Sequence, residues 1–270
     1  MCSAGDATGD NEARLLLPFA PGCRVTRLLR REKRFTAITL DGAGAEVRAH
    51  TNNTGSMLGL LRPGTAALLS PAPPRLKGPD RVLKWTLEAL ALPGGHRGLN
   101  PAWVGVNTLT PNRLLAAAWK AGLLPGATAY PRMTPEAKTG DSRLDARFDG
   151  EDGQGLPPLF VECKNVTLVE DGQAQFPDAA SERGRKHLTE LTRLVGEGCR
   201  AALFFLVQRP DGDCFAPAEA IDPDYAEGLA TALRAGVEVW AWRARITEAG
   251  IHLAERLALA PAWAALQRKP

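Results

Sequence analysis

A short apolar strand that ends in charged residues is the feature that most constrains how this chain can fold. Residues 159–164 read Leu-Phe-Val-Glu-Cys-Lys, and a turn region rich in glycine, proline and aspartate precedes them. The apolar, β-prone start predicts a buried strand. Because side chains alternate along a strand, Glu162 and Lys164 project from one face and Cys163 from the other. Charged side chains are seldom buried unless they are paired or bind a ligand, so this pair needs partners.

An aspartate on a second predicted strand can join the pair. Residues 142–147 read Ser-Arg-Leu-Asp-Ala-Arg and lie a hairpin-length gap before the buried strand. If the two strands pair, Asp145 lies beside Glu162 and Lys164. Two carboxylates and an ammonium at the end of a hairpin can hold a divalent cation and position a water for attack on phosphate, which is the constellation of the PD-(D/E)xK nucleases. The spacing alone also fits a solvated hairpin edge with a surface ion pair.

The length of the chain and the spacing of its cysteines exclude several classes of protein. The 270 residues suffice for one large domain or two modest ones, and no apolar run is long enough for a membrane-spanning helix. Residues 1–11 lack the basic and apolar regions of a secretory signal. Five scattered cysteines without C-x-x-C spacing argue against a zinc ribbon and a disulfide framework. We therefore expect a cytoplasmic protein.

The positive charge is concentrated in two segments. The net charge is only +3, but one short segment near residue 30 holds six cations and one acid, and a second cluster lies near residue 185. Local basic patches can bind phosphate even when the net charge is near neutral. Such runs can also be ordinary solvated faces. The two groups are Arg24, Arg27, Arg30, Arg31, Lys33 and Arg34, and Arg183, Arg185, Lys186 and His187.

The first half of the chain predicts a small β-barrel. Residues 1–17 are expected to be a flexible extension. Between residues 22 and 107, short strand-like segments alternate with turns rich in glycine and proline. This number of short strands suits a barrel, and an OB-fold fits the size. The expected strands are 23–29, 35–40, 46–50, 66–69, 82–91 and 103–106.

The second half predicts helices on both faces of a sheet. A helix at 112–121 is followed by strands, a second helix at 179–197, a fully buried strand at 200–208 and a third helix at 225–235. This order describes an α/β sandwich. The other expected strands are 128–133, 143–148, 160–167, 237–246 and 251–257. The resulting domains are 18–108 for the barrel and 109–260 for the α/β part, with a tail at 261–270.

Several longer motifs closely resemble the sugar fermentation stimulation protein A family, from about Phe19 to Leu259. The resemblance implies an N-terminal OB-fold joined to a PD-(D/E)xK nuclease-like domain, and an association with DNA binding. A valine is common in the family between the glutamate and the lysine, where this chain has Cys163. The motifs are Asn-Asn-Thr-Gly-Ser-Met at 52–57, Val-Asn-Thr at 106–108, Ser-Arg-Leu-Asp at 142–145, Val-Glu-Cys-Lys-Asn-Val-Thr-Leu at 161–168, Phe-Pro-Asp-Ala at 176–179, and Ser-Glu-Arg-Gly-Arg-Lys-His-Leu at 181–188.

These motifs predict a metal site. Asp145 and Glu162 are the expected ligands of Mg²⁺ or Mn²⁺, with the backbone carbonyl of Cys163 as a third, because oxygen ligands suit these hard cations. Lys164 would orient the attacking water or stabilise the transition state. His187 lies on the predicted second helix and would act close to the ligands or in proton transfer. The alternative is a nuclease fold that retains these residues for structure or DNA binding.

DNA is the expected partner. The first half has few aromatic residues, and we expect most of Phe35, Trp85 and Trp103 to lie in the core, so base stacking has little support. Contacts to the backbone phosphates are favoured, which predicts weak sequence specificity and strong salt dependence. A turn or a solvated helix face would explain the same segments without any ligand. The expected contacts are Arg24, Arg27, Arg30, Arg31, Lys33, Asn53, Thr54, Ser56, Arg143, Arg183 and Lys186.

The leading hypothesis is a DNA-binding protein with a metal-dependent phosphodiesterase site. The alternative is a non-catalytic DNA-binding transcriptional regulator linked to sugar (maltose) metabolism, as the family's name suggests. A carbohydrate-handling enzyme is disfavoured, because no aromatic platform accompanies a pair of carboxylates.

Overall fold

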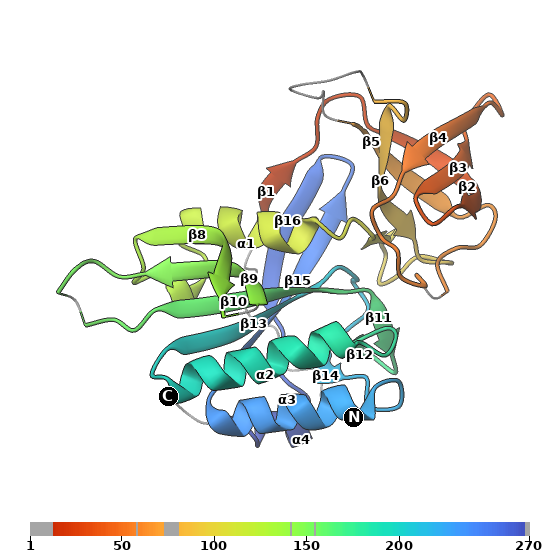
Figure 1. The fold of residues 1–270 in the computed structure, drawn as a ribbon. Helices are drawn as coiled ribbons and strands as arrows, with labels where there is room; N and C mark the ends of the chain where they lie inside the picture. The colour runs from red at the N-terminus through yellow and green to blue at the C-terminus, as the bar shows by residue number, and fades with distance from the viewer. Residues whose placement is uncertain (1–12, 58, 73–80, 141, 154, 268–270) are drawn as a thin grey trace.

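The chain forms a β-barrel and a larger three-layered α/β domain, which lie against each other (Figure 1). The computed structural model describes residues 13–57, 59–72, 81–140, 142–153 and 155–267. The predicted order, an OB-like barrel followed by an α/β domain, is confirmed.

The barrel closes because its outer strand returns to pair across the sheet. The strand order is β4-β3-β2-β5-β6-β7, and β4 also pairs with β6 in parallel. Alternate residues turn inward and form one apolar core that includes Leu28, Ala37, Leu69 and Leu87. Every strand expected from the sequence is present, within a few residues. The strands are β2 (Arg24–Glu32), β3 (Thr36–Leu40), β4 (Glu46–His50), β5 (Ala66–Pro71), β6 (Trp85–Ala91) and β7 (Trp103–Gly105).

A mixed sheet forms the middle layer of the second domain. Its order is β1-β16-β15-β13-β10-β9-β8, and the three central strands β15, β13 and β10 are parallel. Parallel strands are buried on both faces, which explains the continuous apolar run in β13. The strands are β1 (Arg14–Pro18), β8 (Arg132–Thr139), β9 (Ser142–Asp149), β10 (Leu159–Val166), β13 (Arg200–Val207), β15 (Glu238–Thr247) and β16 (Gly250–Arg256).

Helices cover both faces of this sheet. α1 (Thr110–Lys120) begins with Pro111 and packs its apolar side on one face. α2 (Glu182–Gly196) and α3 (Pro223–Ala235) cover the other face (Figure 1). The side chains of Ser181 and Asp222 accept backbone N–H groups at the starts of α2 and α3, which satisfies donors that a helix end leaves free. The predicted helices are thus all present.

The barrel and the α/β domain share part of one core. Leu68, Ala89 and Trp103 of the barrel belong to the same apolar cluster as the residues of α1 and the central sheet. Gly105 at the end of β7 donates its N–H to the carbonyl of Gln208. A Cβ at Gly105 would lie 2.2 Å from Gln208 Oε1, so this close approach requires glycine.

Some expectations about the elements are wrong. Residues Arg14–Pro18 are not a free extension, because β1 pairs with β16. No strand occupies 128–131, because Pro125 opens a 3-10 turn, η1 (Pro125–Ala127), and Pro131 cannot donate to a sheet ladder. The expected tail contains the short helix α4 (Pro261–Ala264). A small sheet was not expected at all; its strands are β11 (Leu168–Glu170), β12 (Gln173–Phe176) and β14 (Cys214–Pro217).

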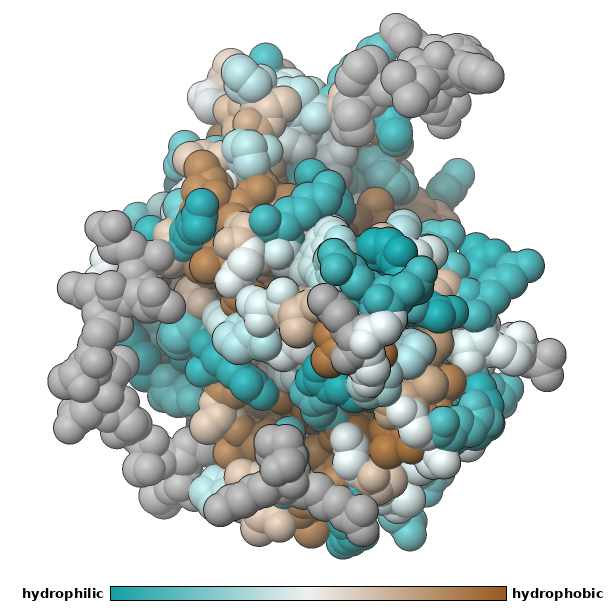
Figure 2. Space-filling model, turned by 90° about the vertical axis from the view of Figure 1, so that its left-hand side faces the viewer, coloured by the Kyte–Doolittle hydropathy of each residue, from teal (hydrophilic) through white to brown (hydrophobic). Residues whose placement is uncertain are grey.

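The bonding state of the cysteines and the length of the helices can be compared with the expectation of a cytoplasmic protein. Cys23, Cys163 and Cys199 are free thiols, whereas Cys214 is disulfide-bonded, against the expectation from the scattered cysteines. Among the residues that the structure describes, no helix has the length and apolar character that a membrane crossing requires. Figure 2 shows the left-hand side of Figure 1, where hydrophilic and hydrophobic side chains are intermixed.

Candidate active site

The site lies where β9 and β10 separate. The antiparallel pairing between these strands runs from Leu159 opposite Phe148 to Val161 opposite Ala146. The next residue of β9 is Asp145, and its Oδ2 accepts the backbone N–H of Cys163 at 2.8 Å. A carboxylate therefore replaces a backbone carbonyl at the point where the ladder ends. This places Asp145 beside the Glu-Cys-Lys segment, as the sequence predicts.

A second contact to Asp145 comes from α1. Asn112 Nδ2 donates to Asp145 Oδ1 at 2.6 Å. Burial raises the pKa of Asp145, as does the nearby carboxylate of Glu162, while the hydrogen bonds from Cys163 and Asn112 act in the opposite direction. The sequence reasoning missed Asn112. Its signal is a polar residue one turn before the buried Leu115, on the side of the helix that faces the sheet.

Glu162 is almost completely buried, with 4% of its surface exposed. Its Oε1 accepts a hydrogen bond from Lys164 Nζ at 2.7 Å and also contacts His187 Nδ1. Burial alone would raise the pKa of Glu162, but these contacts with His187 and Lys164 outweigh it and the pKa is lowered. The other oxygen, Oε2, is buried without a hydrogen-bond partner in the described part of the chain.

Lys164 is held between two elements. Its Nζ lies 2.7 Å from Glu162 Oε1 on the same strand and 3.0 Å from His187 Nδ1 on α2. Its ammonium lies 6.0 Å from the centre of the Phe176 ring. The predicted residues Asp145, Glu162, Lys164 and His187 therefore converge at one place. The next turn of α2 does not join them, because Glu190 accepts hydrogen bonds from Thr139 and Arg193 instead.

The donor set suits a hard cation held by few protein ligands. Asp145 and Glu162 offer carboxylate oxygens, and Cys163 offers its backbone carbonyl. The Cys163 thiol is buried in the core between the sheet and α1. Burial raises the pKa of this thiol well above the usual range, so the thiol is no ligand. Within the described ranges, no group of three or more His, Cys, Asp or Glu side chains is placed to hold a metal. A cation that retains several waters needs fewer protein ligands, and the unpartnered Oε2 of Glu162 can serve as one.

The arginines of β2 are mostly occupied within the barrel. Arg24 lies over the ring of Trp85, with 4.5 Å between the guanidinium carbon and the ring centre. Arg27 donates to the carbonyl of Gly64, and Arg30 forms an exposed ion pair with Glu32 at 2.8 Å. These three remain partly exposed, but each already has a partner.

Arg31 has a structural role. Its guanidinium donates to the backbone carbonyls of Arg34, Asn53 and Gly55, at distances between 2.5 and 3.0 Å. The arginine thereby fastens the loop at 52–57 to the β2–β3 hairpin. With its donors directed at backbone carbonyls, Arg31 is not the free phosphate contact that the sequence predicts.

The tip of the β2–β3 hairpin is the exposed basic part of this segment. Lys33 and Arg34 are exposed and have left-handed backbone angles, with φ of 47° and 61°. Non-glycine residues seldom adopt this conformation, except where the surrounding structure holds them in it. Phe35 follows them with 51% of its surface exposed. Phe35 is therefore an exception to the expectation that most of the aromatic residues of this half lie in the core; Ala37, two residues on, is the residue that turns into the barrel core.

The loop at 52–57 connects the barrel to both helices of the site. Asn52 bonds to Asn107 and to the backbone N–H of Thr108, just before α1. Ser56 Oγ contacts Asp178, just before α2, at 3.5 Å.

Not all of the polar residues of this loop are free. Asn53 is buried, and its Oδ1 accepts the N–H of Gly55, so it stabilises the turn. Thr54 and Ser56 are exposed and can contact a ligand.

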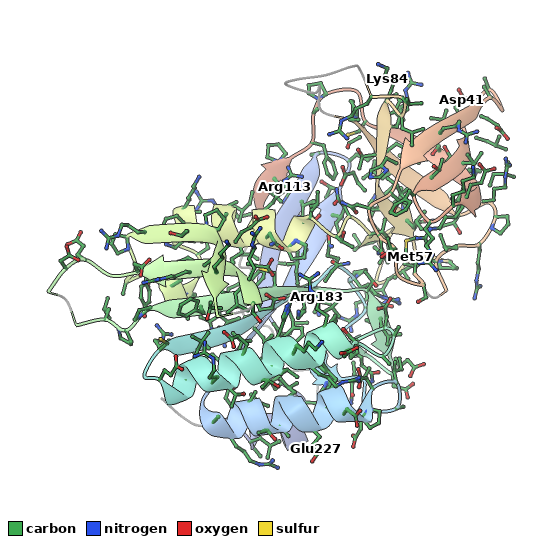
Figure 3. The ribbon with its side chains drawn as sticks, viewed as in Figure 1. Asp41, Met57, Lys84, Arg113, Arg183 and Glu227 are labelled. Carbon is green, nitrogen blue, oxygen red and sulfur yellow. The ribbon has the colours of Figure 1, made fainter. Side chains whose placement is uncertain are left out.

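The remaining basic residues differ in how free they are. Arg143 pairs with exposed Glu136, and Lys186 pairs with exposed Glu182. Arg183, at the first turn of α2, is exposed and has no side-chain partner among the residues that the structure describes. Arg113 on α1, labelled with Arg183 in Figure 3, is also exposed and follows the Asp145 partner Asn112 directly. The sequence reasoning missed Arg113, which belongs to no cluster of charges.

An OB-like barrel joined to an α/β domain with an Asp and Glu-x-Lys site defines a two-domain class of protein. The chain matches the sequence models of two domains, one described as the SfsA N-terminal OB domain, over residues 29–106, and one as the sugar fermentation stimulation protein RE domain, over residues 109–250. The chain therefore belongs to the sugar fermentation stimulation protein (SfsA) family.

Relatives match along nearly the whole chain. The sugar fermentation stimulation protein homolog of Maridesulfovibrio salexigens is 52% identical over 246 residues, which cover 91% of this chain and 97% of the relative. The homolog of Syntrophobacter fumaroxidans is 49% identical over 249 residues, covering 92% and 89%. A solved structure described as Pyrococcus furiosus SfsA in complex with Ca²⁺ has a TM-score of 0.77 and 27% identity, and the match covers 92% of this chain and all of that one.

Proposed function

We propose that this protein binds DNA and cleaves its phosphodiester bonds with the help of a divalent cation at the β9–β10 separation. The observation that carries the proposal is the arrangement of Asp145, Glu162 and Lys164. A buried carboxylate, Glu162, and a half-buried one, Asp145, lie close enough for Glu162 to raise the pKa of Asp145, and one oxygen of Glu162 has no partner in the described residues. Buried acceptors without partners are costly, and a cation is the ligand that relieves two adjacent carboxylates.

Asp145, Glu162 and the Cys163 carbonyl would hold Mg²⁺ or Mn²⁺. When bound, the ion would neutralise charge on the scissile phosphate and acidify a water. The solved relative from Pyrococcus furiosus is described with Ca²⁺, which likewise prefers oxygen ligands, and this supports the proposal.

Lys164 and His187 have distinct roles in the proposal. The ammonium of Lys164 would orient the attacking water or stabilise negative charge on the phosphate. His187 Nδ1 contacts both the Lys164 ammonium and Glu162 Oε1, so His187 fixes the direction of these two side chains and is a positioning residue.

Exposed cations near the site would bind the DNA backbone. Arg113 and Arg183 lie on the two helices that supply Asn112 and His187, and the hairpin tip adds Lys33 and Arg34. Contacts of this kind neutralise phosphates without reading bases, so binding should be weakly sequence-specific and salt-dependent.

The test is cleavage of labelled single- and double-stranded DNA with Mg²⁺, with Mn²⁺ and with EDTA. Wild type should cleave only with metal, and Asp145→Ala should be inactive. Asp149→Ala is the matched control, because Asp149 lies on the same strand and its carboxylate pairs, among the described residues, with Arg147 alone. Intact DNA in every lane, or equal cleavage by Asp145→Ala, would overturn the proposal.

A second candidate is a non-catalytic DNA-binding regulator. It is favoured by the small number of ligand side chains, since no cluster of three metal-binding groups forms among the described residues. Gel shifts in EDTA distinguish the two functions. A regulator should bind one operator far more tightly than random DNA, with no metal requirement and no strand loss.

A further inference from the structure

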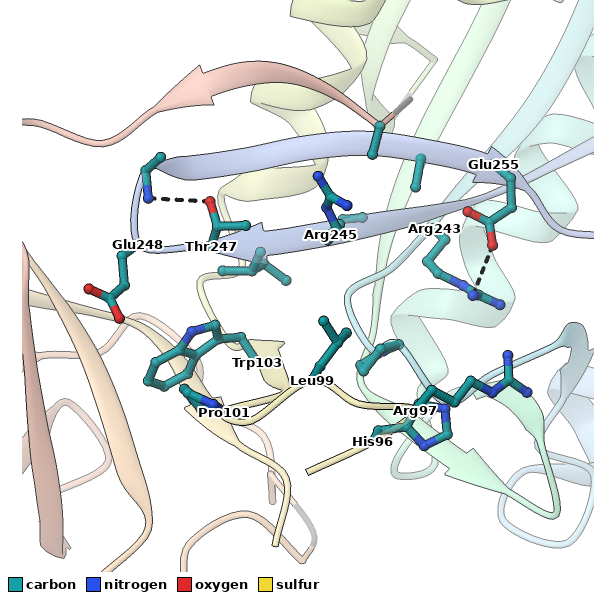
Figure 4. Close-up of a pocket in the computed structure, with 16 residues that line it drawn as sticks. His96, Arg97, Leu99, Pro101, Trp103, Arg243, Arg245, Thr247, Glu248 and Glu255 are labelled. Atoms are coloured by element: carbon teal, nitrogen blue, oxygen red, sulfur yellow. Dashed lines mark hydrogen bonds and ion pairs between the residues drawn. The ribbon is translucent and has the colours of Figure 1, made fainter. Parts of the chain in front are cut away.

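A second site lies between the barrel and the β15–β16 hairpin. A cavity of about 1070 Å³ opens there, and none of the residues of the candidate active site lines it. One wall is the loop at 96–103, which leads into β7, and the other wall is the hairpin (Figure 4). This volume slightly exceeds the usual range of small-ligand sites, about 300–1,000 Å³.

The loop wall has a fixed backbone. His96 and Leu99 exchange backbone hydrogen bonds of 3.0 and 2.8 Å. A Cβ at Gly95 would lie 2.4 Å from the Leu99 carbonyl oxygen, so the turn requires glycine there. Arg97 has a left-handed φ of 45°. Such strain in a non-glycine residue is concentrated at functional sites, where the surrounding structure holds it in place.

Apolar side chains line one side of the cavity. Figure 4 shows Leu99, Pro101 and Trp103 along the loop, opposite the hairpin that carries Ile246. Leu99 has 44% of its surface exposed at this wall of the cavity. A ligand with a flat apolar body would cover this surface.

Arginines line the other side. Arg245 is exposed and has no side-chain hydrogen bond or ion pair within the described ranges. Arg243 pairs with Glu255 at 2.8 Å, donates to the carbonyl of Gly212 and lies 3.7 Å from Asp213. Its Nε is buried without a partner in the described structure, as is Nε2 of His96. An arginine Nε–H can only donate, so the group that completes this site must supply acceptor oxygens.

We propose that this cavity binds a nucleotide, with its phosphate on Arg245 and its base against Leu99 and Pro101. Guanidinium groups match phosphate oxygens geometrically and bind them strongly. The exposed carboxylate of Glu248, at the tip of the hairpin, provides an acceptor for sugar hydroxyls. The same chemistry is offered by a free nucleoside monophosphate and by the phosphorylated end of a strand. The site needs neither a metal nor Asp145, so it stands apart from the proposed nuclease activity.

The test is direct binding of a fluorescently labelled nucleoside 5′-monophosphate in EDTA, followed by anisotropy. Wild type should bind at concentrations below about 1 mM. Arg245→Ala should weaken binding by about tenfold or more, because it removes charge-assisted hydrogen bonds. Arg234→Ala is the matched control, since Arg234 is exposed at the end of α3 and does not line the cavity. Asp145→Ala should bind as wild type does, whatever the outcome of the cleavage assay.

The apolar wall and the source of the phosphate are tested separately. Leu99→Ala should weaken the binding of the nucleotide several-fold but leave competition by inorganic phosphate unchanged. A 5′-phosphorylated trinucleotide that competes better than the mononucleotide assigns the cavity to a strand end, and the reverse order assigns it to a free nucleotide. Absence of nucleotide binding by wild type, or an equal loss in Arg234→Ala and Arg245→Ala, would overturn the proposal.

Discussion

The candidate active site and the basic strand β2 are both rich in charge, yet the fold uses them in opposite ways. At the active site, the charged groups are buried and contact one another, while Glu162 Oε2 keeps no partner in the described structure. Along β2, the arginines are half-exposed, but their donors are directed at carbonyls, carboxylates and a ring of the barrel itself. A basic run in a sequence therefore does not by itself define a binding surface, because tertiary partners decide which cations are free.

The largest effect should come from the buried lysine. Lys164→Ala should lower DNA cleavage by about 100-fold or more, because it removes the ammonium that lies beside Glu162 and His187. Circular dichroism and DNA binding should stay close to wild type. Lys138→Ala, on the exposed strand β8, is the control and should cleave normally. If Lys164→Ala cleaves DNA as fast as wild type does, this lysine has no role in the mechanism. The contrast between the active site and β2 would then fail.

Arg31 should matter for stability more than its exposed neighbour does. Arg31→Ala should lower the free energy of unfolding by about 1.5–3 kcal/mol, because three backbone carbonyls lose charge-assisted hydrogen bonds. Arg30→Ala should cost less than about 1 kcal/mol, because it breaks only exposed ion pairs. Urea unfolding of the two variants measures the difference. If both lose stability equally, the assignment of a structural role to Arg31 fails.

Phe35 tests whether the hairpin tip binds single strands. Phe35→Ala should weaken binding of single-stranded DNA by about tenfold, because stacking on an aromatic ring contributes about 1–3 kcal/mol per base. Duplex binding should change little, because paired bases are not available for stacking. Val25→Ala is the control, since Val25 is 45% exposed on the same barrel. Anisotropy with both kinds of DNA distinguishes the outcomes, and equal losses for the two would contradict stacking.

A smaller effect is expected from the charge of Asp145 on stability. The folded-state pKa of Asp145 is raised, first by burial and then by Glu162, so its ionised form disfavours the folded state. The neutral variant Asp145→Asn should therefore melt a few degrees higher than wild type in EDTA at neutral pH. This gap should be absent below the ordinary aspartate pKa, 3.8, and should open as the pH rises through the raised folded-state value. Thermal melts across pH check it; a gap that grows in acid would contradict the sign.

Much of the active site was predictable because strand and helix periodicity determine it. The alternation along β10 places Glu162 and Lys164 together. Helical spacing groups His187 with Arg183 and Lys186 on one face of α2, but in the structure His187 is buried whereas Arg183 and Lys186 are exposed. The contact from Asn112 was not predictable in this way, because it depends on how α1 packs against the end of β9.

The barrel shows the limit of local patterns more clearly. Its strands follow from alternating apolar residues and turns, and all are present. The occupation of Arg31 depends on contacts with the distant loop at 52–57, which no local pattern reports. The same holds for β1, whose partner β16 lies near the other end of the chain.

The pairing of β1 with β16 also determines where the barrel is placed along the chain relative to the α/β domain. The chain enters the large sheet, leaves it to build the barrel, and returns through α1, so the barrel is an insertion within the α/β domain rather than an appendage in front of it. Two covalent connections therefore anchor the barrel, which restricts rotation more than a single hinge would. A fragment that starts after the barrel would leave β16 as an unpaired edge, and such an edge favours strand pairing with another molecule.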